Sequence, residues 1–290
     1  MRYLLSILII LISFFGTSQT HSLDGVWQGI IYDQGEKVKQ GEAFWIDMDI
    51  DLSEKSISGV SRVEKPYKEY FAYKRMKGAV LSDSSVHFEE INIRKKKESS
   101  DQIWCVNEGD LIYNKKTGYL EGEWQSTDCK RQSGRIILFR SKYSLSTTDT
   151  NSLYHSWFDN FVGDLKRGWK AYYVRDAEMR NFEFVPVYFD HDMDDLKITF
   201  EPYLSQMVKI VLSHSDLRIK IIGHTDSNGT DSYNVDLSQR RADRIKAFLI
   251  DQGLKADRVI IEFRGERDPA TSNATKKGKS LNRRVDFEFI

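Results

Sequence analysis

The last third of this 290-residue chain carries an alternating apolar segment, then a short polar loop, then a helical pattern. Residues 217–221 alternate apolar and charged side chains, as a half-buried strand does. Gly223 then allows a sharp turn, and residues 224–231 are polar. From Val235 the apolar side chains recur on one helical face. This order predicts a strand–loop–helix unit, and the loop at the carboxyl end of such a strand is a usual place for ligand contacts.

The neighbouring segments extend this unit into a sheet with helical connections. Residues 200–212 carry apolar side chains at i, i+3, i+4 and i+7, which predicts an amphipathic helix. Further strands are predicted at residues 185–190, 258–263 and 284–289. Strands separated by helices predict βαβ crossovers. For residues 181–290 we therefore expect an α+β domain, a βαβαββ-type mixed sheet with helices on one face.

Two side chains of opposite charge are predicted to face one cleft of this domain. Asp226 lies in the polar loop, and Arg241 lies about one turn inside the following helix. A carboxylate can accept from an ammonium, and a guanidinium can hold a carboxylate with two parallel hydrogen bonds. The pair therefore suits a zwitterionic ligand. The alternative is that Asp226 only caps a turn and Arg241 only forms a surface ion pair.

Four short motifs in this region resemble the peptidoglycan-binding domain of the OmpA family, which peptidoglycan-associated lipoproteins and flagellar motor stators share. They read GHTD at 223–226, YN at 233–234, LSQRRA at 237–242 and NRRV at 282–285. Several motifs in the right order are more specific than any one of them. The resemblance implies that Asp226 and Arg241 hold the side-chain end of meso-diaminopimelate in the peptidoglycan stem peptide. By motif position it implies further ligand-site residues: Thr225, Asn234, Leu237, Asp190, Asn282 and Arg284.

Other site chemistries find less support in the sequence. Asp190, Asp192, Asp194 and Glu201 match positions 1, 3, 5 and 12 of a calcium-loop template. However, Asp195 stands where that loop requires glycine, so an acidic, solvated loop is the better interpretation and no metal or cofactor is predicted. The chain also has no nucleophile elbow, zinc-protease motif or phosphate loop, so we predict that it is not an enzyme.

The N-terminus indicates the compartment. Residues 1–18 are predicted to be a signal peptide, because Arg2 precedes an apolar stretch at 4–15, with Gly16 and Ser18 before a cut at Gln19. We expect an exported protein in the periplasm, associated with the cell outer membrane. Lys and Arg total 43 and Asp and Glu total 43, so no net charge draws the chain to nucleic acid.

Residues 19–142 are predicted to form an all-β domain. Short strand patterns with turn signals between them occur at 25–30, 44–50, 70–76, 86–93, 102–105, 119–125 and 135–140. Such a series predicts a meander that closes into a small barrel or a sandwich. The Gly-x-Trp motifs at 25–27 and 122–124 resemble lipocalin-like barrels, which implies a small apolar ligand, although aromatics on alternating strands also serve simply as core.

The chain has two cysteines, Cys105 and Cys129. In an oxidising compartment such a pair predicts a disulfide; the alternatives are two buried thiols or half of a metal site. Residues 143–180 are predicted to be a linker and a connecting helix.

These observations leave three classes of function. The leading one is a noncatalytic envelope protein that binds peptidoglycan and anchors the envelope, or an associated complex, to the cell wall. The second is a structural component of an envelope secretion or motility complex, with a protein partner for the β-domain. The third is a small-ligand carrier that uses the β-domain.

Overall fold

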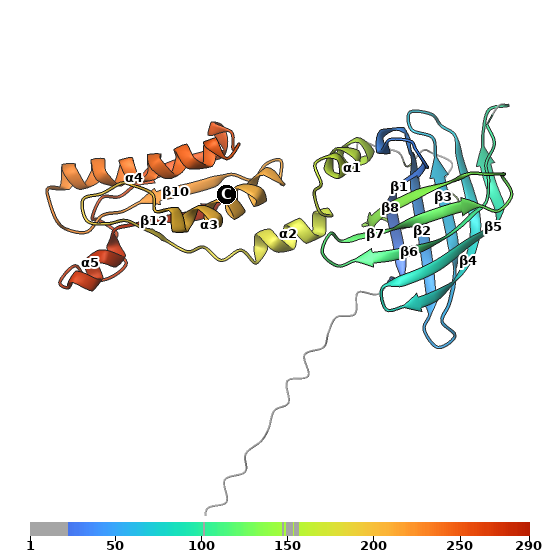
Figure 1. Cartoon of the computed structure of the whole chain (residues 1–290), viewed down its shortest axis with the longest axis horizontal. Helices are drawn as coiled ribbons and strands as arrows, with labels where there is room; N and C mark the ends of the chain where they lie inside the picture. The colour runs from blue at the N-terminus through green and yellow to red at the C-terminus, as the bar shows by residue number, and fades with distance from the viewer. Residues whose placement is uncertain (1–22, 101, 147, 149–152, 154–156) are drawn as a thin grey trace, which may run out of the picture. The chain divides into compact units, whose positions relative to one another are not determined.

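The computed structural model describes residues 23–100, 102–146, 148, 153 and 157–290 (Figure 1). The predicted signal peptide therefore lies outside the described residues. The chain divides into two compact units, residues 1–168 and 169–290, and each is described by itself.

The first unit is a closed antiparallel barrel in which every strand pairs with its neighbours in sequence (Figure 1). Its strands are β1 (Gly25–Asp33), β2 (Glu42–Asp51), β3 (Ser56–Glu64), β4 (Phe71–Ser82), β5 (Ser85–Lys97), β6 (Asn107–Asn114), β7 (Tyr119–Ser126) and β8 (Ser133–Arg140). A short 3-10 turn, Val38–Gln40, lies between β1 and β2. β8 closes the barrel by pairing with β1, from Trp27 opposite Arg140 to Asp33 opposite Gly134. The sequence predicted either a small barrel or a sandwich, and the structure is a barrel.

The sequence analysis did not predict β3 and β6. It did predict a strand at residues 102–105, but these residues are irregular and lead into β6. Ser61, which alternates with core residues of β3, is polar but buried, because its hydroxyl donates to Glu90. A strand whose inward positions include polar residues with buried partners does not show the apolar alternation on which the prediction rested.

Helix α1 (Trp157–Lys166) packs on the outer surface of the barrel through aromatic rings. The Trp157 ring lies 5.5 Å from that of Trp45 and the Phe161 ring 4.8 Å from that of Phe139. Trp45 and Phe139 alternate along their strands with residues of the barrel core, so they point outward. The predicted helical stretch is interrupted at Gly168, whose φ of +67° favours glycine, and α2 (Tyr172–Arg180) follows in the second unit.

The second unit is a four-stranded mixed sheet in the order β11-β10-β12-β9. The chain runs through β9 (Val187–Tyr188), α3 (Glu201–Leu212), β10 (Ile219–Gly223), α4 (Asp231–Asp251), β11 (Val259–Phe263), α5 (Lys276–Asn282) and β12 (Arg284–Phe289), with 3-10 turns at Ile198–Phe200 and Ala256–Arg258. β10 and β11 are parallel, whereas β12 is antiparallel to β10 and β9. The short helix α5, which Thr275 caps, was not predicted.

The core of this unit lies between the sheet and the helices α3 and α4. Ile219 and Ile221 of β10 are fully buried, together with Leu204 and Val211 of α3 and Ile245 of α4. The side chain between the two isoleucines, Lys220, pairs with Glu262 and Glu288 of the adjacent strands. The alternation therefore directs the apolar side of β10 toward the helices and its charged side away from them.

Gly223 is required for a different reason from the predicted turn. A Cβ at this position would lie 2.1 Å from the backbone oxygen of Ser238 in α4. Glycine therefore lets α4 pack closely on the end of β10, which brings together the two elements whose residues were predicted to form a ligand site. The helix also begins earlier than predicted, at Asp231, because the Thr230 side chain accepts from Tyr233 N at 3.3 Å. Within the described residues, no helix is both long and apolar enough to cross a membrane.

Candidate functional site

A cavity of about 230 Å³ opens at the carboxyl end of β10. Its wall comes from the loops after β9 and β10, the first turns of α4 and the residue before β12. The lining residues are His191, Asp192, Thr225, Asp226, Asn228, Gly229, Tyr233, Asn234, Leu237, Arg241 and Arg283. The loop–helix unit that the sequence indicated thus forms most of one polar cavity.

Asp226 is buried in the wall of this cavity and is held by two donors. Its Oδ1 accepts from the backbone nitrogen of Asn228 at 3.0 Å, and its Oδ2 accepts from Arg283 Nη1 at 2.9 Å. An ionised carboxylate offers about four acceptor positions, so about two remain for a ligand. His191 Nδ1 lies 4.0 Å from Oδ2, at the exposed side of the cavity.

Arg241 is fully buried and organises the loops around the cavity. Its guanidinium donates to three backbone oxygens: Nε to Met193 at 2.9 Å, Nη1 to His224 at 3.0 Å and Nη2 to Asp190 at 3.1 Å. These bonds use three of five N–H groups and leave one on each terminal nitrogen. Burial, followed by the charge of Arg283, lowers the Arg241 pKa to about 10, so the side chain is still a cation at neutral pH.

The structure brings five of the eight predicted site residues to the cavity wall: Asp226, Arg241, Thr225, Asn234 and Leu237. Asp190 contributes its backbone oxygen to Arg241, whereas its exposed side chain pairs with Lys197. Asn282 is buried and bonds to Thr271 and Asn273, so it shapes the loop before α5.

Arg284 does not line the cavity, and this corrects the prediction made from motif position. Its Nε lies 2.9 Å from Asp286 Oδ2, and its terminal nitrogens approach the backbone oxygen of Asp268. Arg283, which the sequence analysis did not select, lies on the cavity and pairs with Asp226. Consecutive residues entering a strand project to opposite sides, so only one of two adjacent arginines can face the cavity. The pair of arginines in the NRRV motif was the available signal.

Two buried polar atoms beside Asp226 have no hydrogen-bond partner among the described residues: Thr225 Oγ1 and His224 Nδ1. Thr225 lines the cavity, so its hydroxyl can serve a ligand. The pKa of His224 is lowered to about 4, mainly by burial and then by the charge of Arg284. His224 is therefore neutral at pH 7 and adds no charge to the site.

The acidic loop after β9 is stabilised by pairs within the protein. Asp190 pairs with Lys197, Asp194 lies 3.9 Å from Arg240, and the Tyr233 hydroxyl donates to Asp192. These contacts connect the acidic loop to α4 and to Lys197.

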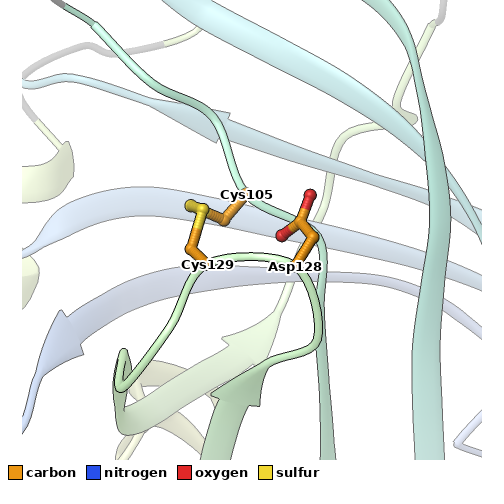
Figure 2. A group of neighbouring side chains, drawn as sticks. All are labelled: Cys105, Asp128 and Cys129. Atoms are coloured by element: carbon orange, nitrogen blue, oxygen red, sulfur yellow. A yellow bond between two sulfur atoms is a disulfide. The ribbon is translucent and has the colours of Figure 1, made fainter.

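Cys105 and Cys129 form a disulfide, as predicted, with Cα atoms 5.8 Å apart. They belong to the only cluster of three candidate metal ligands within the described part of the chain, which Asp128 completes (Figure 2). Figure 2 shows the two sulfur atoms bonded to each other, so neither is available as a thiolate ligand. The Asp128 carboxylate accepts from Val106 N at 2.9 Å and thus holds the loop next to the disulfide.

The family model described as OmpA family matches residues 188–283, which include the whole cavity wall. This segment is an OmpA family domain. Outer membrane protein A of Bordetella avium is 37% identical over 103 residues, which cover 36% of this chain and 53% of that protein. The peptidoglycan-associated lipoprotein of Buchnera aphidicola is 31% identical over 98 residues, which cover 34% of this chain and 57% of that protein.

A third relative matches beyond the OmpA family domain. The sodium-type flagellar protein MotY of Vibrio parahaemolyticus is 27% identical over 165 residues, which cover 56% of this chain and 49% of that protein. The chain thus spans about half the length of each of these relatives. Their names place them in the outer membrane, among lipoproteins or in the flagellum, so the similarity is to proteins of the cell envelope rather than to a family of enzymes.

Proposed function

We propose that this protein is a noncatalytic envelope protein whose OmpA family domain binds peptidoglycan. The ligand group is the zwitterionic side-chain end of meso-diaminopimelate in the stem peptide. The observation that carries the proposal is the buried Asp226 carboxylate in one cavity with the guanidinium groups of Arg241 and Arg283. Binding would attach the envelope, or a complex associated with it, to the cell wall.

The charges of the cavity suit this ligand. Asp226 has acceptor positions left for an ammonium, and Arg241 has two N–H groups left for a carboxylate. The cavity wall carries two cations, Arg241 and Arg283, and two carboxylates, Asp226 and Asp192. Its formal charges therefore balance, which suits a ligand that carries both an ammonium and a carboxylate. Hydrogen bonds between charged partners are stronger than neutral ones, especially where water is excluded.

The environment of the cavity favours a preorganised binding site over a catalytic one. Asp226 and Arg241 are each fixed by hydrogen bonds before any ligand arrives, which reduces the ordering cost of binding. His191 lies at the exposed side of the cavity, and His224 is buried and neutral at pH 7 because burial lowers its pKa to about 4. The names of the relatives support the same interpretation.

Co-sedimentation with purified sacculi tests the proposal. The wild-type protein should sediment with sacculi whose stem peptide contains diaminopimelate, and less with sacculi that contain lysine, because lysine lacks the second carboxylate. Equal sedimentation with both types would contradict the role of that carboxylate. Release of soluble muropeptides by the pure protein, abolished by a point substitution, would contradict the noncatalytic assignment.

A second candidate function is a structural role in an envelope motility or secretion complex. It is favoured by the similarity to the flagellar protein MotY, which extends over 165 residues and therefore beyond the OmpA family domain. In this function the barrel would hold a protein partner. Cross-linking in cells followed by mass spectrometry would support it if one envelope protein were attached to the barrel, and would count against it if only residues of the OmpA family domain were cross-linked.

A further inference from the structure

A second cavity, of about 200 Å³, lies at one mouth of the barrel. It is lined where β1 and β3 end, where β2 begins and by the segment that leads into β6, through residues such as Ile31, Val63, Glu42 and Trp104. In an up-and-down barrel these positions belong to the same end. The cavity is much larger than the roughly 30 Å³ that one water molecule occupies in the liquid.

The centre of the barrel below this mouth is filled by side chains. Phe44, Met48, Phe88, Leu111 and Leu138 are among the fully buried residues of one continuous core, to which all eight strands contribute. An interior of this kind is a packed core, as is usual for a small barrel. The space that a ligand can enter is therefore the mouth, whose wall differs chemically from the core.

The buried charges near this mouth are neutralised within the protein. Lys74 Nζ lies 2.7 Å from Glu90 Oε2, and both side chains are at most 2% exposed. Lys65 pairs with Glu42. The cations are therefore already occupied, and an anionic ligand would gain little from them. An apolar ligand would also be unfavourable, because it would remove these paired charges from water without offering hydrogen bonds.

Two polar groups of the wall lack a partner among the described residues. They are Trp104 Nε1 and Asn107 Oδ1. The exposed fractions of Trp104 and Asn107 are 7% and 6%, and both residues line the cavity. The indole nitrogen can only donate, whereas the amide oxygen can only accept. A ligand that satisfies both must carry an acceptor and a donor, a combination that each hydroxyl group provides.

We propose that this mouth is a binding site for a neutral, hydroxyl-rich small molecule of about the size of one sugar ring. Its hydroxyl groups accept from Trp104 Nε1 and donate to Asn107 Oδ1. Its C–H faces pack against the indole rings of Trp104 and Trp124, since both residues line the cavity. The Trp124 indole nitrogen already donates to the Tyr32 backbone oxygen at 3.3 Å, so this residue offers mainly its ring. The site does not depend on the function proposed for the OmpA family domain.

Titration calorimetry on the full exported chain tests this site. The probes are glucose, N-acetylglucosamine and glycerol, with laurate and free lysine as probes of the apolar and zwitterionic classes. We expect saturable binding of at least one hydroxylated probe. Trp104→Phe removes the N–H but keeps a ring, and should weaken that binding about tenfold, the effect of one lost hydrogen bond.

The matched control is Trp157→Phe. Trp157 lies on the outer surface of the barrel, and its indole nitrogen donates to Leu153 O at 3.2 Å. This variant should bind like the wild type. If Trp104→Phe does not fold, as judged by circular dichroism, Asn107→Leu tests the acceptor in its place.

Three results would overturn the proposal. The first is that none of the three hydroxylated probes shows saturable binding, which would mean that water alone satisfies the two groups. The second is that laurate or lysine binds in preference to them. The third is that the folded Trp104→Phe and Asn107→Leu variants bind a hydroxylated probe as well as the wild type does.

Discussion

Arg283 Nη1 donates to Asp226 Oδ2 at 2.9 Å, so the carboxylate of the cavity already has a cationic partner before a ligand binds. The Asp226 side chain is 4% exposed and that of Arg283 15%. A carboxylate in such an environment is expensive to leave unpaired. Arg283 therefore orients the Asp226 carboxylate, while Arg241, which bonds to three backbone oxygens, fixes the surrounding loops. The two arginines have different roles, and their substitutions should have different consequences.

Asp226→Asn should reduce the affinity for soluble diaminopimelate stem peptide while the domain stays folded. The substitution keeps the shape of the side chain and removes the charge that would meet the ligand ammonium. Loss of one partner of a buried charge pair costs about 2–5 kcal/mol, which is about thirtyfold or more in affinity. Titration calorimetry measures the change. The control is Arg244→Ala, because Arg244 is exposed, lies 3.6 Å from Asp195 and is not part of the cavity wall. Near-wild-type affinity of folded Asp226→Asn would contradict the proposed site.

Arg241→Ala should lower the stability of the domain as well as its affinity. The substitution removes three charge-assisted hydrogen bonds from buried or partly buried backbone oxygens. Each such bond contributes about 1.5–3 kcal/mol, so a total loss of about 3 kcal/mol or more is expected. Urea denaturation checks this. Arg244→Ala, which removes an exposed guanidinium from the same helix, should change stability by less than about 0.5 kcal/mol. Equal stability of the two variants would show that Arg241 acts on the ligand only.

Replacing Cys105 and Cys129 together by serine should destabilise the barrel by about 2–5 kcal/mol. The disulfide joins residues 24 positions apart and so restricts the unfolded chain. Thermal unfolding under non-reducing conditions should show a lower transition temperature for the barrel, with no change for the OmpA family domain. A fall in both transitions to the same extent would mean that the two units unfold together.

Acidification should destabilise the OmpA family domain through His224. Its pKa in the folded protein is about 4, below the ordinary value of 6.5, because burial disfavours the charged form. The unfolded chain therefore binds a proton more readily, and the contribution of His224 is complete above pH 6.5 and is lost as the pH falls toward 4. The melting temperature of wild type and His224→Gln should be compared between pH 7 and 4.5. Between these pH values the melting temperature of His224→Gln should fall less than that of the wild type. An equal fall in both proteins would exclude His224 as the cause.

The local pattern of the sequence was sufficient to predict the central elements of the second unit. Residues 217–221 alternate and 237–249 repeat at helical spacing, so one face of each element is apolar and the two faces must meet. The motifs then indicated Asp226 and Arg241 and the loop that carries Asp226. The cysteine pair likewise predicted the disulfide, because it is the only pair in the chain.

Local pattern does not encode which polar groups become partners in the folded chain. The fold pairs Asp226 with Arg283, 57 residues away, and Arg284 lies beside Asp286 instead. The fold also buries Ser61 of β3 against Glu90 of β5, so that a polar residue occupies a core position that no periodicity would predict. The physical reason is the same in both cases. Apolar burial depends only on which face a residue occupies, whereas a buried polar group is stable only beside a specific partner, and that partner is fixed when the whole chain has folded.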